Sequence, residues 1–146
     1  MPDEATTKKA NEDLREGKSP TTAAGEFVHE EIEHVREGKH GARSPQQAIA
    51  IGLSKARRAG IPVKPPAKGK TSKSTRQKAE RDYEKGQTDP QTSEEGTTKR
   101  SRSRMEAMKR EPKSTASHSA LSRHAKSAAK KLPRKASRRS ATRRIR

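Results

Sequence analysis

The chain has 146 residues, no Cys, no Trp, one Phe and one Tyr, and a formal net charge of +18. Only 25% of the residues are apolar and 37% are charged, a balance typical of disordered chains. Ordering costs roughly 1 to 2 kcal/mol of backbone entropy per residue, so this composition predicts at most one small folded element. The lack of Cys excludes disulfides, thiolate metal sites and thiol chemistry.

Two segments near the N-terminus share a pattern of residues that typically end one helix and begin the next. LREGKSPTTAA and VREGKHGARSPQQA both contain an Arg-Glu-Gly-Lys stretch followed by Ser-Pro. Gly is placed to end one helix, and Ser-Pro is placed to begin the next as N-cap and first helical residue. In the second segment, Ser44 and Gln47 have the spacing of a capping box. The first 19 residues form an acidic and polar N-terminal segment.

The same boundaries enclose two amphipathic helices, over residues 20–37 and 44–59, each with an apolar stripe at the helical period. The short loop GKHGAR joins them, so the pattern predicts an αα-hairpin over about residues 20–60, within a folded core of residues 20–63. This core is thin. Self-association through the hairpin, or binding to a partner, could supply the missing burial.

The rest of the chain is predicted to be largely unfolded. Residues 64–98 read as a linker with a short polar helix over residues 74–86, supported by side-chain pairs at helical spacing. Another short helix is expected around residues 102–110, within a basic and largely disordered tail of residues 99–146. The predicted fold class is therefore mostly disordered, with all-α elements: the hairpin and short isolated helices.

Charge is distributed unevenly along the chain. Residues 1–43 carry a net charge of −3 and residues 44–96 carry +5, whereas residues 97–146 carry eighteen Lys and Arg against two Glu. Such a tail is suited to a polyanion, because neutralising phosphates releases counterions. Residues 119–132 are Ala-rich and could become helical on binding. Lipid is a weaker candidate, because the tail lacks a broad apolar face.

A second basic cluster, KARRAG, ends the second hairpin helix. Its cations could interact with the carbonyl end of that helix or contact phosphates. With one Tyr and one Phe, the chain has no stacking platform for single strands, so backbone contact without strong base preference is expected. The predicted nucleic-acid-binding residues are Lys55, Arg57, Arg58, Arg123, Lys126, Lys130, Lys131, Arg134, Lys135, Arg138, Arg139, Arg143, Arg144 and Arg146.

Metal binding and catalysis are not expected from the sequence. HEEIEH places His29 and His34 five residues apart, which turns their rings about 140° from each other on a helix, unlike a zinc-binding HExxH helix. His40, His118 and His124 have no third ligand at a familiar spacing. The motifs GxGxxG, GxxxxGK[ST] and GxSxG are absent. We therefore expect no enzyme, no cofactor and no metal.

The stretch GARSPQQAIAIGLSKARRAG, together with its flanking segments, resembles a bacterial family of small, basic, uncharacterised proteins. Their shared block Gln-Ala-Ile-Ala-Ile-x-Leu-Ser-x-Ala matches Gln47 to Ala56, with Gln46 where many members have Lys. The likeness covers roughly residues 15–86. The tail resembles the Lys- and Arg-rich histone-like tails of bacteria by composition only. The resemblance implies no established activity.

Together these patterns predict a non-enzymatic protein that binds nucleic acid through phosphates, with DNA favoured over RNA. No apolar run approaches the roughly 20 residues of a membrane helix, and the beginning, MPDEATTKK, does not resemble a secretory signal. We therefore expect a cytoplasmic, nucleoid-associated protein with no membrane partner. The alternative is a protein–protein interaction module in which the basic tail is accessory.

Overall fold

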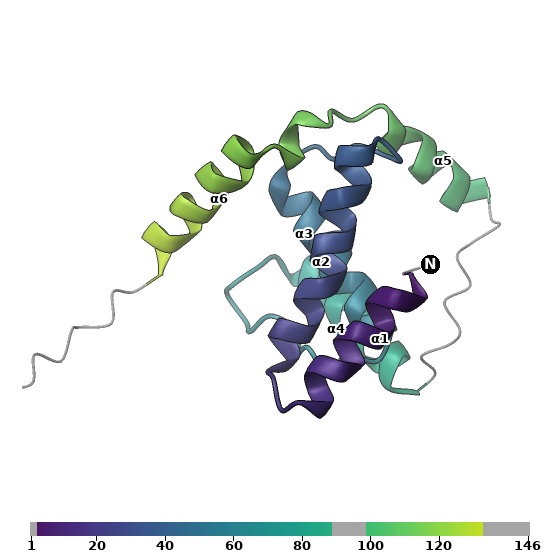
Figure 1. The fold of residues 1–146 in the computed structure, drawn as a ribbon, viewed down its shortest axis with the longest axis vertical. Helices are drawn as coiled ribbons and strands as arrows, with labels where there is room; N and C mark the ends of the chain where they lie inside the picture. Colours follow the sequence, from purple (N-terminus) through teal and green to yellow (C-terminus); the bar gives the residue numbers. More distant parts are fainter. Residues whose placement is uncertain (1–2, 89–98, 133–146) are drawn as a thin grey trace, which may run out of the picture.

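The computed structural model describes residues 3–88 and 99–132. Apart from one isolated bridge between Lys68 and Thr71, the regular elements of these ranges are helices (Figure 1), which confirms the all-α class. In chain order they are α1 (Glu4–Arg15), α2 (Pro20–Glu37), α3 (Pro45–Arg58), α4 (Lys73–Thr88), α5 (Lys99–Lys109), the 3-10 helix η1 (Ser114–Ala116) and α6 (His118–Lys131). None of the helices in the described ranges has both the length and the apolar composition that crossing a membrane requires.

The boundaries of α2 and α3 lie at the predicted capping residues. Ser19 and Ser44 are the N-caps of α2 and α3, and each accepts a hydrogen bond from a backbone N–H in the first turn. Gly38 ends α2 with φ +81° and Gly17 follows α1 with φ +80°, a left-handed conformation that L side chains rarely adopt. The expected capping box differs in one contact. The Gln47 side chain accepts from the N–H of Arg43 at 2.6 Å, one residue before the cap.

Replacing the α3 cap should measurably destabilise the fold. Ser44→Ala removes the acceptor that lies 3.2 Å from the backbone N of Gln47, so we expect the free energy of unfolding to fall by about 1 kcal/mol. Urea denaturation measures this loss. Ser122→Ala, at an exposed site within α6, is the control and should change stability by less than about 0.5 kcal/mol. Equal stability of both variants would contradict the cap.

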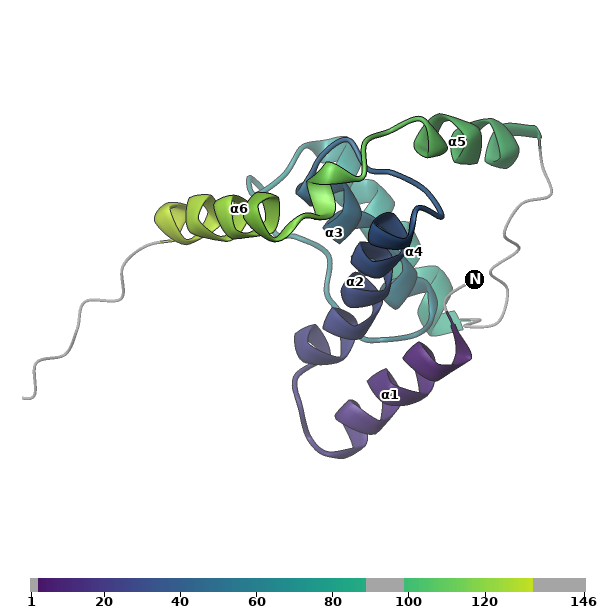
Figure 2. The same cartoon turned by 45° about the horizontal axis from the view of Figure 1, so that its top comes forward.

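Two clusters of buried apolar side chains hold the helices together. The Phe27 core contains Ala10, Ala23, Ala24, Phe27, Ala56 and Ile61 and joins α1, α2 and α3. The Val35 core contains Val35, Ala42, Ala48 and Ala116. Most of these residues are alanines, so the helix backbones approach closely. α2 and α3 pack along one another as expected of the hairpin, but α1 packs against α2 and α4 packs against α3, which enlarges the folded unit (Figure 2).

The α2–α3 loop is held by a segment far along the chain. Gly41 and Ala42 donate backbone hydrogen bonds to the carbonyls of Met108 and Pro112, at 2.8 and 3.2 Å. Arg36 Nε donates to the carbonyl of Ala116 at 3.0 Å. The end of α5 and the chain between α5 and α6 are therefore attached to the end of the hairpin, and α5 and α6 lie to either side of that end (Figure 1).

The structure extends the expected organisation at both ends of the hairpin. Most of the N-terminal acidic segment is helix α1, and the polar helix expected over residues 74–86 is α4, over residues 73–88. α5 agrees with the short helix expected around residues 102–110, and η1 and α6 also lie in the segment that the sequence predicts to be largely disordered. Residues 133–146, which complete that segment, lie outside the described residues.

Candidate nucleic-acid interface and a buried histidine–glutamate cluster

Helix α6 is a basic helix with little contact to the rest of the fold. Its N-cap is Ser117, whose side chain accepts from the backbone N–H of Ala120. Only Ala120, Leu121 and His124 are half-buried, and the other residues of the helix are exposed. Figure 2 shows α6 projecting from the packed helices.

Three of the four cations of α6 lie along one side of the helix. Arg123, Lys126 and Lys130 are spaced i, i+3 and i+7, which places them on one face. We call these three residues the α6 stripe. The sequence of α6, HSALSRHAKSAAKK, contains no Asp or Glu, so no carboxylate within the helix neutralises the stripe.

A shallow groove of about 520 Å³ adjoins the first turn of α6. It is lined by Pro45, Gln46, Ser114, Thr115, Ser117, Ser119, Ala120, Arg123 and His124. Pro45 and Gln46 begin α3, and Ser117 caps α6, so two helix N-termini border the same groove. Helix N-termini favour anions, but here Pro45 has no N–H, and the N–H groups of Gln47 and Ala120 already donate to the capping serines. Arg123 lines the groove and also belongs to the α6 stripe, so the two features are continuous.

Each of the three predicted site residues of the hairpin contacts another part of the fold, and Arg58 is also exposed. Lys55 Nζ donates to the buried carboxylate of Glu31. Arg58 Nε lies 2.8 Å from Asp82 Oδ1, and this pair links α3 to α4. Arg57 is buried and its Nε donates to the carbonyl of Val63 at 3.2 Å.

Burial also affects the pKa of Arg57. It lowers the pKa of the guanidinium, and the attraction of the nearby Asp82 carboxylate opposes that shift. Arginine is a very strong base, so the side chain stays charged at neutral pH.

The remaining predicted site residues divide between described and undescribed parts of the chain. Arg123, Lys126, Lys130 and Lys131 belong to α6. The residues from Arg134 to Arg146 lie outside the described residues, so their role stays a prediction.

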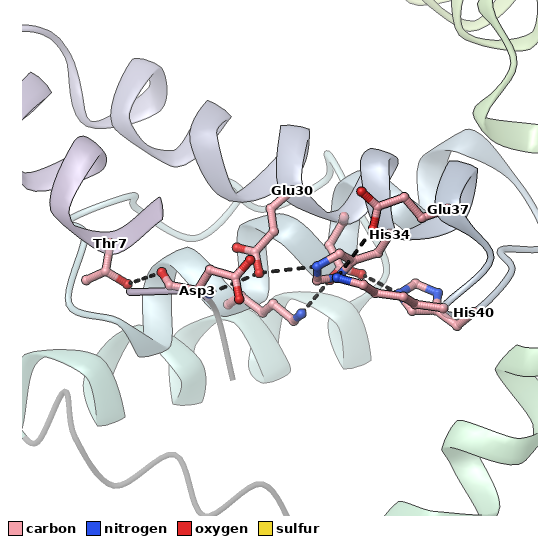
Figure 3. Close-up of polar contacts among 9 residues, drawn as sticks. Asp3, Thr7, Glu30, His34, Glu37 and His40 are labelled. Carbon is pink, nitrogen blue, oxygen red and sulfur yellow. Dashed lines mark hydrogen bonds and ion pairs between the residues drawn. The ribbon is translucent and has the colours of Figure 1, made fainter. Parts of the chain in front are cut away.

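A buried polar cluster lies along α2 and reaches the α2–α3 loop (Figure 3). We define the Glu31 cluster as Glu30, Glu31, His34, His40 and Lys55. Glu31 is fully buried. Its Oε1 accepts from Lys55 and lies 3.4 Å from His34 Nδ1, while its Oε2 lies 3.2 Å from His40 Nε2. One carboxylate thus faces an ammonium group and two imidazole rings.

The outer nitrogens of the two rings also have acceptors. His34 Nε2 lies 3.6 Å from Glu30 Oε1, which in turn accepts from the backbone N–H of Asp3 at 3.1 Å. His40 Nδ1 lies 2.9 Å from the carbonyl oxygen of Gly41. The rings are nearly perpendicular, with an interplanar angle of 84°. The cluster therefore joins the start of α1, the middle of α2, the loop and α3.

Sequence spacing did not point to this cluster. His29 and His34 do point differently, since the His29 side chain is 73% exposed while that of His34 is 13% exposed. His34 instead meets His40, which lies beyond the end of α2. The available signal was the pairing of Glu31 with His34 at i, i+3, which shares a helix face, followed by a glycine-rich turn that can fold back.

Comparison of the chain with protein-family models, with curated proteins and with solved structures finds no match in any of the three. The resemblance to a bacterial family of small basic proteins therefore stays a prediction.

Proposed function

We propose that the chain binds nucleic acid, with DNA favoured over RNA, through phosphate contacts without strong base preference. The observation that carries this proposal is α6, an exposed helix with four Lys and Arg and no carboxylate. Binding of such a helix to phosphates is favourable, because the counterions condensed on the nucleic acid are released. The protein would act without catalysis, as a nucleoid-associated protein of the cytoplasm.

The surroundings of α6 support the same role. The groove at its first turn offers hydroxyl groups and Arg123, which are donors that suit phosphate oxygens. Helix α5, at the same end of the fold, has the sequence KRSRSRMEAMK, with five Lys and Arg against one Glu. The hairpin cations Lys55, Arg57 and Arg58 carry less weight here, because each already has a contact within the fold.

Neutralising the α6 stripe tests the location of the interface. The test variant carries Arg123→Gln, Lys126→Gln and Lys130→Gln. Its slope of log K against log salt should be shallower by almost 3, since each lost phosphate contact on duplex DNA contributes about 0.9. Fluorescence anisotropy with a labelled duplex at several salt concentrations measures the slope. The same titration with duplex RNA compares the two nucleic acids.

A matched control separates position from total charge. Lys73, Lys78 and Lys85 are exposed residues of α4, and their replacement by Gln removes the same three charges. We expect this variant to keep nearly the full slope. If both variants lose the same amount, binding depends on net charge alone and α6 is not the interface.

A further inference from the structure

We propose that Glu31, His34 and His40 form a binding site for one divalent transition-metal ion, with zinc the best fit to the ligand set. Each residue offers one ligand atom, and these atoms all lie within 4.8 Å of one another. Imidazole nitrogen and carboxylate oxygen are ordinary zinc ligands, and two His with one Glu is an established zinc set. The site is independent of the basic surface of α6.

The distances in the cluster suit a shared ion. Ligands bound about 2.0 to 2.2 Å from a tetrahedral zinc ion are separated from each other by roughly 3.3 to 3.6 Å. His34 Nδ1 lies 3.4 Å from Glu31 Oε1, and His40 Nε2 lies 3.2 Å from Glu31 Oε2. An ion bound by the Glu31 carboxylate would therefore be within reach of both rings with small side-chain adjustments.

The outer nitrogen of each ring is already oriented as in metal sites. A histidine ligand usually donates its other N–H to a carboxylate or a backbone carbonyl, which fixes the ring and its tautomer. His34 Nε2 faces the Glu30 carboxylate, and His40 Nδ1 faces the Gly41 carbonyl. A carbonyl oxygen can only accept, so His40 Nδ1 carries the proton, and in the neutral ring Nε2 presents its lone pair to Glu31.

An unpartnered oxygen gives independent support. Glu31 Oε2 is buried and has no hydrogen-bond partner, although His40 Nε2 lies nearby. When His40 is neutral, two electron pairs face each other there, and a cation between them removes the conflict. The charges of the cluster also favour a cation. It contains two buried carboxylates, those of Glu30 and Glu31, and one ammonium group, that of Lys55. Buried charge without a partner is costly.

Burial places the site inside the fold. Glu31 is fully buried and His40 is 6% exposed. The ion would connect α2 with the α2–α3 loop, to which the segment between α5 and α6 is attached. Lys55 is the competing cation, because its ammonium group contacts Glu31 Oε1. Lys55→Gln should therefore strengthen binding of a divalent ion at least tenfold.

Titration of the full-length, chelator-treated protein with Zn²⁺ alone tests the site. We expect one ion per chain, with affinity reduced at least tenfold in His34→Gln and in His40→Gln. His29→Gln is the matched control, since His29 lies on the same helix but outside the cluster, and it should leave the affinity unchanged. Circular dichroism of each variant establishes that it folds.

Nitrogen-detected NMR of the imidazole rings provides a second measurement on the unaltered sequence. Zn²⁺ should shift the resonances of His34 Nδ1 and His40 Nε2 and leave His29, His118 and His124 unshifted. The proposal is overturned if the protein takes up no Zn²⁺, if the shifts occur at the other three histidines, or if folded His40→Gln binds as tightly as the parent. None of these experiments contains nucleic acid, so their result is independent of the proposed function.

Discussion

Deletion of residues 118–146 is expected to weaken binding to duplex DNA by at least about 100-fold near 50 mM salt and to flatten its salt dependence. This deletion removes eleven of the eighteen Lys and Arg that follow residue 96. If half of the eighteen contact phosphates, log K should fall against log salt with a slope near −8 for the full chain. With half of the remaining seven in contact, the slope should be near −3.

The deletion begins at residue 118 because the preceding segment supports the fold. Ala116 belongs to the Val35 core, and Thr115 Oγ1 donates to the carbonyl of Ala42 at 2.9 Å. A deletion from residue 97 would remove these contacts and confuse loss of binding with loss of structure. Circular dichroism of the shortened chain should retain the helix content of the helices that precede α6.

Two results would contradict the proposed function. A slope near −1 for the full chain would mean that it engages about one phosphate. Unchanged DNA affinity after the deletion would place the interface elsewhere. The alternative of a protein interaction module makes the opposite prediction, since a protein partner that binds the hairpin should still bind the shortened chain.

Local sequence signals were sufficient to predict where α2 ends and where α3 begins. A helix that ends at Gly38 and another that starts at Ser44 are determined by neighbouring residues, and the structure agrees at both. The all-helical class follows from the same signals. The extent of the packed unit does not follow from these local signals. Counting large aliphatic side chains undervalued alanine, which makes up most of both cores, and so α1 and α4 were not assigned to the packed unit.

Contacts between distant parts of the chain could not be predicted. Arg36 meets the carbonyl of Ala116, eighty residues away. Lys55 and Arg58 look like free cations in the sequence, and only the fold shows that Glu31 and Asp82 lie beside them. His40 joins His34 because the loop turns back at the end of α2. In each case the partner is determined by tertiary packing, for which spacing along one helix carries no signal.

Two glycines in the hairpin should respond in opposite ways to the same substitution, and this tests the packing of α2 on α3. Gly25 is exposed within α2, and a Cβ there would meet nothing within 4 Å. Gly25→Ala should stabilise the protein by roughly 0.5 to 1 kcal/mol, because glycine is a poor helix residue. Gly52 is buried within α3, and a Cβ there would lie 2.6 Å from Val28 Cα.

Gly52→Ala should therefore destabilise the protein by about 1 to 3 kcal/mol, the usual cost of overpacking. The helices would have to move apart, because the blocking atoms include the backbone of Val28 and not only its flexible side chain. Urea denaturation of the two variants beside the parent protein measures both effects. Val28→Ala in the Gly52→Ala background should restore little, since it removes the Cγ2 atom, 2.9 Å from the added Cβ, but leaves the Val28 backbone in place.

The pair of glycines separates helix propensity from packing. Propensity alone predicts that both substitutions stabilise, because Ala is the better helix former at either position. If Gly52→Ala also raised the free energy of unfolding, α2 and α3 could not approach as closely as described. The Glu31 cluster would then lose its basis, because Lys55 extends from α3 to reach the carboxylate on α2. A loss at Gly52 with a gain at Gly25 requires the close approach of the two helices on which both the hairpin and the cluster depend.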